Sequence, residues 1–214
     1  MPALEPVTAA LVDLSAAIAA GGAEDVARAA TEALEAGAGV PAVYEAVLQS
    51  YLFLGFPRAI EAFFAVRPAL ERRIPGEGAL AAPRAPAAAP DLDVWRRDGE
   101  ALCRRVYGRN YEKLMETMRD LSPDLASRMI LEGYGKTLSR PGLGGVDREY
   151  AVVAILTVTR MWRQLRSHAI GAVNVGGTRA GVRAAIERCR RWAADGGIDE
   201  ALGTVGLEEG NARR

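Results

Sequence analysis

The segment QLRSHAIGAVNVG, residues 164–176, matches an earlier segment of the chain, DVARAATEALEAG at residues 25–37. Apolar residues and a closing glycine coincide at an offset of 139 residues: Val26 with Leu165, Leu34 with Val173, and Gly37 with Gly176. Apolar residues three and four positions apart form one face of a helix. The match therefore predicts two copies of one helical unit, which pack together because neither can hide its apolar face alone.

The rest of the sequence also favours helices. YAVVAILTV at 150–158 has the β-branched content of a strand, but no other segment offers a partner strand, so we expect a helix. GFP at 55–57 is expected to break a helix, and Pro68 to end the short helix that follows. The predicted fold class is all-α.

The predicted organisation has four parts. Residues 1–74 form the first helical unit and residues 92–205 the second, which carries the candidate site. Residues 75–91 form a connector, since four prolines and two glycines stand without period among the alanines of 75–90. Residues 206–214 are expected to be a frayed tail.

Composition narrows the function classes. The 27 basic and 27 acidic residues balance, which gives no electrostatic reason to expect a nucleic-acid partner. No apolar run approaches the roughly 20 residues that a membrane helix needs, and Glu5 precedes any apolar run at the N-terminus. Cys103 and Cys189 lack redox or zinc spacing, so we expect reduced thiols, no metal site and a cytoplasmic protein.

His168, the single histidine, and Glu149 are the candidate acid–base pair. In one straight helix they would lie about 28 Å apart, at 1.5 Å per residue. The β-branched run 157–159 weakens the helix, and a chain reversal near Thr159–Met161 would bring the two to the same level of a helical hairpin. A carboxylate beside an imidazole can hold its tautomer and raise its basicity, as general acid–base catalysis requires.

Further residues fit a small-molecule site around His168. Met161, Gln164 and Gly171 share its helix face, and Arg160 offers a planar fork for a substrate carboxylate. On the residues alone other interpretations remain open. A lone histidine is more often a core or surface residue, and Glu149 and the nearby arginines are as readily solvated charges.

Three stretches together resemble the carboxymuconolactone decarboxylase family, which includes the alkylhydroperoxidase D-like proteins. They are EALEAGAGVPAVYEAVLQSYLFLGFPRAIEAF at 32–63, LSPDLASRMILEGYGKTLSRPGLGGVDREYAVVAIL at 121–156 and RQLRSHAIGAVNVGGTRAGVRAAI at 163–186. The resemblance implies an all-helical fold and a homo-oligomer, often a trimer or hexamer.

In the peroxidase members a glutamate precedes Cys-x-x-Cys and a histidine. The resemblance places that glutamate at Glu149 and the histidine at His168, but Met161 and Gln164 stand where the two cysteines would be. Peroxidase chemistry needs both thiols, so the resemblance favours a lyase or isomerase that acts without a cofactor on a small carboxylated ring compound. A helical oligomer or ligand binder without catalysis is the alternative, and a peroxidase using displaced cysteines is a third.

Overall fold

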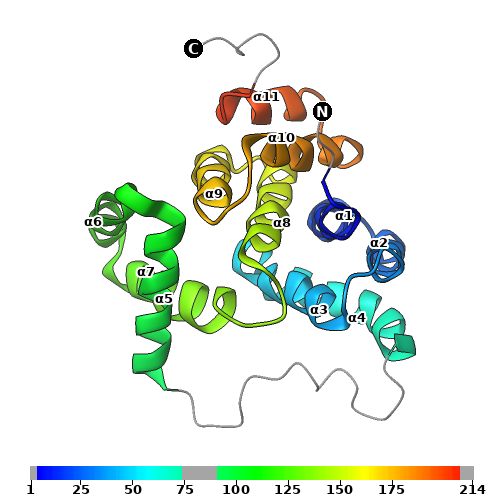
Figure 1. Cartoon of the computed structure of the whole chain (residues 1–214), viewed down its shortest axis with the longest axis horizontal. Coiled ribbons are helices and arrows are strands. Elements are labelled where there is room, and N and C mark those ends of the chain that lie inside the picture. Colours follow the sequence, from blue (N-terminus) through cyan, green and yellow to red (C-terminus); the bar gives the residue numbers. More distant parts are fainter. Residues whose placement is uncertain (1–3, 74–90, 208–214) are drawn as a thin grey trace. The chain divides into compact units, whose positions relative to one another are not determined.

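The computed structural model describes residues 4–73 and 91–207, and every regular element within these ranges is helical (Figure 1). The all-α prediction is confirmed, including a helix over YAVVAILTV. Residues 75–90 of the predicted connector and 208–214 of the predicted tail lie outside the described residues. The elements are α1 (Pro6–Ala20), α2 (Ala23–Glu35), α3 (Val40–Gln49), α4 (Tyr51–Arg73), α5 (Leu92–Tyr107), η2 (Gly108–Asn110), α6 (Tyr111–Leu121), α7 (Pro123–Arg128), η3 (Met129–Leu138), α8 (Gly145–Val158), α9 (Trp162–Asn174), α10 (Arg179–Arg188), η4 (Cys189–Arg191) and α11 (Gly197–Thr204).

The chain forms two compact units, divided differently from the predicted halves 1–74 and 92–205. Unit 1 combines Met1–Pro83 with Gly142–Arg214, and unit 2 is Arg84–Pro141. The second copy of the repeat packs with the first mainly through α1 and α8, and each copy also centres an apolar cluster of its own. Helices α5 to η3 stand between the two copies in the sequence and form a unit of their own.

The repeat is visible in the helix bounds of unit 1. Helices α1, α2 and α3 begin at residues 6, 23 and 40, and α8, α9 and α10 begin at 145, 162 and 179, 139 residues later in each case. Gly37 and Gly176 occupy equivalent positions after the second helix of each copy, and both have positive φ, 100° and 112°. In Figure 1, α9, α8, α1 and α2 follow one another across unit 1, with α1 and α8 side by side at the centre.

Helix α8 is the most enclosed element of unit 1. Ten consecutive residues, Arg148–Thr157, are buried, and α1, α9 and α10 pack around them. A helix that is buried on all sides must satisfy any polar side chain it carries inside the protein. Thr157 does so with its own helix, since its hydroxyl donates to the Val153 carbonyl at 2.8 Å.

Arg148 of α8 reaches a buried carboxylate on α3. Its Nη2 donates to Oε2 of Glu45 at 3.0 Å, and its Nη1 donates to Oε1 of Gln49 at 3.2 Å. The side chains of Arg148 and Glu45 are only 5% and 1% exposed, so both charges are removed from water. This pair ties α3 of the first copy to α8 of the second.

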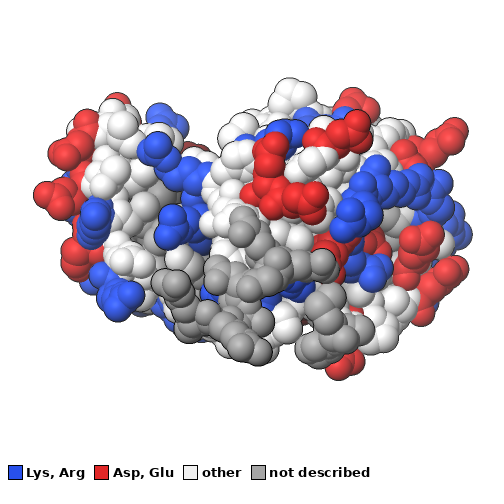
Figure 2. All heavy atoms as spheres, turned by 90° about the horizontal axis from the view of Figure 1, so that it is seen from above, with Lys and Arg blue, Asp and Glu red and all other residues white. Residues whose placement is uncertain are grey.

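The surface carries both signs of charge. On the face drawn in Figure 2, basic and acidic side chains are interspersed rather than gathered by sign. Within residues 4–73 and 91–207, no helix is both long enough and apolar enough to cross a bilayer.

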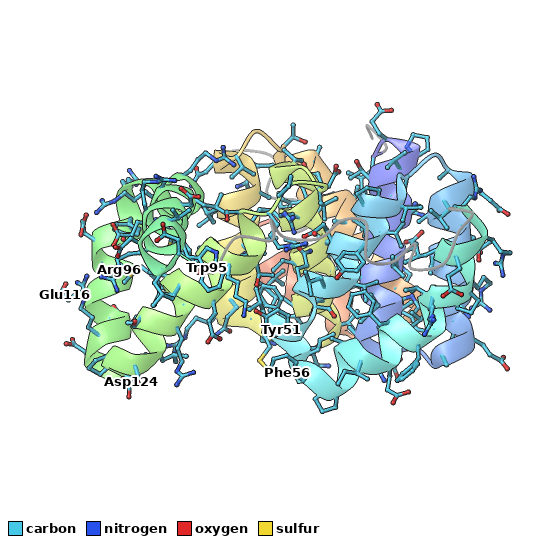
Figure 3. The ribbon with its side chains drawn as sticks, turned by 90° about the horizontal axis from the view of Figure 1, so that it is seen from below. Tyr51, Phe56, Trp95, Arg96, Glu116 and Asp124 are labelled. Carbon is cyan, nitrogen blue, oxygen red and sulfur yellow. The ribbon has the colours of Figure 1, made fainter. Side chains whose placement is uncertain are left out.

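Unit 2 is built on a close contact between α5 and the π-helix η3. A Cβ placed on Gly135 would lie 2.0 Å from the carbonyl oxygen of Trp95, and one on Gly99 would lie 2.3 Å from that of Ile130. Only glycine allows the two backbones to approach in this way. Lys136 lies over the Trp95 ring at 5.4 Å on the same contact (Figure 3).

The buried ion pair leads to a stability prediction. Glu45→Ala should lower the free energy of unfolding by about 3–5 kcal/mol, because it leaves the Arg148 guanidinium buried without its carboxylate. Glu71→Ala is the matched control, since Glu71 pairs with Arg67 at the surface and its loss should cost less than about 1 kcal/mol. Urea denaturation followed by circular dichroism measures both, and equal losses would contradict the assignment.

Candidate functional site

The chain reverses between α8 and α9, as the sequence predicts for Thr159–Met161. Arg160 adopts φ 58°, the left-handed conformation, and α9 begins two residues later at Trp162. Thr157 and Thr159 turn their hydroxyls back onto the Val153 and Ile155 carbonyls, both at 2.8 Å. Threonine hydroxyls that bond the carbonyl four residues earlier slightly destabilise and bend a helix, which favours the end of α8 at this point.

This hairpin brings the predicted acid–base pair into contact. Nδ1 of His168 on α9 lies 2.9 Å from Oε2 of Glu149 on α8. The two residues are 6% and 5% exposed, so the contact is nearly closed to water. Because a carboxylate can only accept, Nδ1 carries the hydrogen and donates it, which leaves Nε2 as the basic nitrogen of the neutral ring.

Nε2 of His168 remains available. Among the described residues nothing forms a hydrogen bond with it. Phe53 on α4 packs edge-on against the imidazole, with ring centroids 5.6 Å apart.

Aromatic rings continue along α4 beside this contact. Tyr51 stacks on Phe56 with ring centroids 5.1 Å apart (Figure 3), and the backbone of Gly55 between them leaves the helical region with φ 78°. The kink is the break that the sequence predicts at GFP. Phe56 is 68% exposed, so this second aromatic pair lies at the surface.

The other predicted site residues are less closely gathered. Met161 is 52% exposed and Gln164 is also exposed, whereas Gly171 is buried. Arg160 holds Glu200 of α11 instead, with Nη2 at 2.8 and 2.6 Å from the two carboxylate oxygens, and its guanidinium lies 5.5 Å from the Trp162 ring. The structure therefore joins His168 and Glu149 by a direct bond and leaves Met161, Gln164 and Arg160 at the surface.

Two features near the pair were missed by the sequence analysis. One is Phe53, which packs on His168, and the other is the buried cluster of Arg148 with Glu45 and Gln49, adjacent in sequence to Glu149. Glu45 and Gln49 stand four residues apart within the apolar run VYEAVLQS, and this spacing places both on one helix face. That pattern was the available signal for a buried polar cluster.

A hollow in unit 1 lies on another face of α9. It encloses about 450 Å³ and is lined by residues of α9, α10 and α11 together with the chain that follows α11, up to Leu207. Neither His168 nor Glu149 lines it. The His168–Glu149 pair therefore lies outside the hollow, which is a separate feature of unit 1.

Both cysteines are buried and neither forms a disulfide; Cys103 belongs to unit 2 and Cys189 to unit 1. Burial raises the pKa of the Cys189 thiol far above its usual range, and its Sγ lies 3.3 Å from the Ala185 carbonyl. A peroxidatic cysteine needs the opposite environment, accessible and favourable to the thiolate. Within residues 4–73 and 91–207, no group of three or more histidine, cysteine, aspartate or glutamate side chains is arranged to hold a metal ion.

Comparison with known proteins shows a distant similarity in sequence to a fission-yeast protein. No protein-family profile matches the sequence. The chain is similar to the protein named peroxisomal protein 2 of Schizosaccharomyces pombe, with 29% identity over 185 residues that cover 85% of this chain and 84% of that protein. The match spans nearly the whole of both chains, so the relative is similar in overall extent as well as in sequence.

The burial of both thiols predicts that they are inert in the folded protein. Iodoacetamide should leave Cys103 and Cys189 unmodified at neutral pH, and both should react once the chain is unfolded, because unfolding exposes them and returns the Cys189 pKa to its ordinary range. Mass spectrometry of the intact protein counts the adducts. The Arg163→Cys variant supplies an exposed control thiol on α9, and modification of native Cys189 at a rate similar to that of this control would contradict the burial.

Proposed function

We propose that His168 is a general acid–base residue, oriented by Glu149, in a cofactor-free lyase or isomerase of the carboxymuconolactone decarboxylase type. The observation that carries the proposal is the 2.9 Å contact of Nδ1 with Glu149 combined with an Nε2 that forms no hydrogen bond among the described residues. A buried imidazole held in one tautomer with its second nitrogen open is suited to moving protons. The substrate class, a small carboxylated ring compound, follows from the family resemblance.

The chemistry requires proton delivery to carbon. Loss of CO2 from a lactone acid breaks a carbon–carbon bond and leaves an electron pair that spreads into the lactone carbonyl. The protonated ring of His168 gives its Nε2 proton to the carbon and becomes neutral, and Nε2 then takes a proton from solvent. Glu149 accepts the Nδ1 hydrogen in this cycle because its carboxylate lies against Nδ1.

The alternative is a protein that uses the pair only for structure. The burial of His168 and Glu149 favours it, since a buried carboxylate needs a partner whether or not a reaction occurs. The exposure of Met161 and Gln164 also removes two groups that were expected to line a pocket. A peroxidase remains the least supported candidate, because Met161 and Gln164 cannot supply thiols.

The remaining parts of the proposal concern assembly and location. We propose that the chain forms a homo-oligomer, a trimer or hexamer, and acts on a small molecule in the cytoplasm. The Schizosaccharomyces pombe relative is named as a peroxisomal protein, which makes the peroxisome the competing compartment for this chain.

Replacement of His168 by asparagine separates catalysis from structure. The asparagine amide can donate to Glu149 from near the position of Nδ1 but has no counterpart of Nε2. We expect turnover of a lactone acid such as carboxymuconolactone, followed by ultraviolet absorbance, to fall on the order of 10²- to 10⁴-fold in His168→Asn. The melting temperature should stay closer to that of the wild type than in His168→Ala.

Glu149→Gln completes the test. It keeps an acceptor for Nδ1 but removes the negative charge, so activity should fall while the fold persists. Full activity in His168→Asn would refute the catalytic role. A wild-type protein that turns over no lactone acid, together with stability lost in His168→Ala and restored in His168→Asn, would favour the structural alternative.

A further inference from the structure

The two copies of the repeat differ in how their second helix is covered. In the first copy, α4 continues along α2 to Arg73, and its last turns place Ala69 and Leu70, 4% and 0% exposed, in the apolar cluster that contains Ala30 and Leu34. In the second copy, α11 ends at Thr204, a position equivalent to Ala65 of α4. The sequence has Glu208 and Glu209 where the repeat would place Ala69 and Leu70.

Among residues 4–73 and 91–207, nothing equivalent to the last turns of α4 covers this part of α9. Val173 of α9 is 40% exposed, whereas its equivalent on α2, Leu34, is 5% exposed. Ile170, one turn before Val173, is 44% exposed. The hollow of about 450 Å³ lies against these residues, and we name it the α9–α11 groove. The groove is therefore the position that α4 fills in the first copy.

The lining of the α9–α11 groove is mixed, with apolar side chains, two arginines and the polar residues Asn174 and Thr204. Six apolar side chains contribute: Ala169, Ile170, Val173, Val182, Val205 and Leu207. Arg166 and Arg179 also line it, and none of the described lining residues is acidic. Arg179 is held in place, since its Nη2 donates to the Gly206 carbonyl at 2.9 Å.

Arg166 differs from Arg179. Among the described residues its guanidinium has neither an ion-pair partner nor a hydrogen bond, so its planar set of donors is open to a ligand. A guanidinium pairs with a carboxylate through two parallel hydrogen bonds, which a cation or a neutral alcohol cannot accept in the same way. The apolar lining would exclude water from the remainder of such a ligand.

We propose that the α9–α11 groove binds an amphipathic monocarboxylate, with the carboxylate on Arg166 and Arg179 and an alkyl chain against the apolar lining. The volume falls within the range of sites that enclose small organic molecules, roughly 300–1,000 Å³. Helices α9, α10 and α11 all line the groove. A concave site of this kind fits a small ligand better than it fits the flat surface of a protein partner. The inference goes beyond the proposed reaction and does not depend on the His168–Glu149 pair.

Octanoate is the probe, titrated into the full chain and followed by isothermal calorimetry. We expect saturable binding, with 1-octanol and octyltrimethylammonium binding at least about tenfold more weakly, because neither can accept the charged hydrogen bonds. Arg166→Gln and Arg179→Gln should each weaken octanoate binding by about tenfold. Arg163→Gln is the matched control, since Arg163 is exposed on the same helix but does not line the groove.

A steric variant tests the location. Val173→Trp should fill the groove and abolish octanoate binding with unchanged helical content, because Val173 is already 40% exposed, whereas Arg163→Trp should bind as the wild type does. His168→Asn should also bind octanoate normally, which separates failure of this inference from failure of the proposed catalysis.

Three results would overturn the inference. The first is octanoate binding that is absent in the wild type or unchanged in Val173→Trp. The second is equal affinity for octanoate and octyltrimethylammonium. The third is a wild-type oligomer that Val173→Trp converts to a monomer in analytical ultracentrifugation, which would assign the groove to a second copy of the chain.

Discussion

The enclosure of α8 is the constraint on which unit 1 depends. Because residues 148–157 are buried on every side of the helix, each polar side chain among them must find its partner within the protein. Arg148 finds Glu45 and Gln49 on α3, Glu149 finds His168 on α9, and Thr157 uses its own helix. The His168–Glu149 contact is thus one of those that allow α8 to carry polar side chains while it is buried in unit 1.

Divergence between the two copies accounts for what is particular to this chain. Ala10 and Ala29 stand where the second copy has Glu149 and His168, so the pair occurs once in unit 1 although its helices occur twice. The short α11 opens a groove where the longer α4 covers the first copy. His168 and the groove both lie on α9, and Glu149 contacts that helix from α8.

Much of the site followed from the sequence, whereas long-range packing did not. Local helix patterns in the sequence predicted three features: the 139-residue offset of the repeat, the reversal at Arg160, and the position of His168 beside Glu149. The buried Glu45–Arg148 pair joins residues 103 positions apart, and periodicity identifies a buried face but not its partner. Pro68 was expected to end a helix, yet α4 continues to Arg73. Pro68 has no N–H to donate to the carbonyl of Phe64, four residues earlier. Phe64 is 67% exposed, so water can replace that bond.

The central claim is that Glu149 fixes one tautomer of a buried imidazole and leaves Nε2 open. Long-range ¹H–¹⁵N NMR tests it directly, because a single histidine gives an unambiguous spectrum. At a pH where the ring is neutral, the account predicts a protonated Nδ1 and an unprotonated Nε2, a pattern lost in Glu149→Ala. A ring protonated on Nε2, or a wild-type spectrum like that of a solvent-exposed histidine, would contradict it.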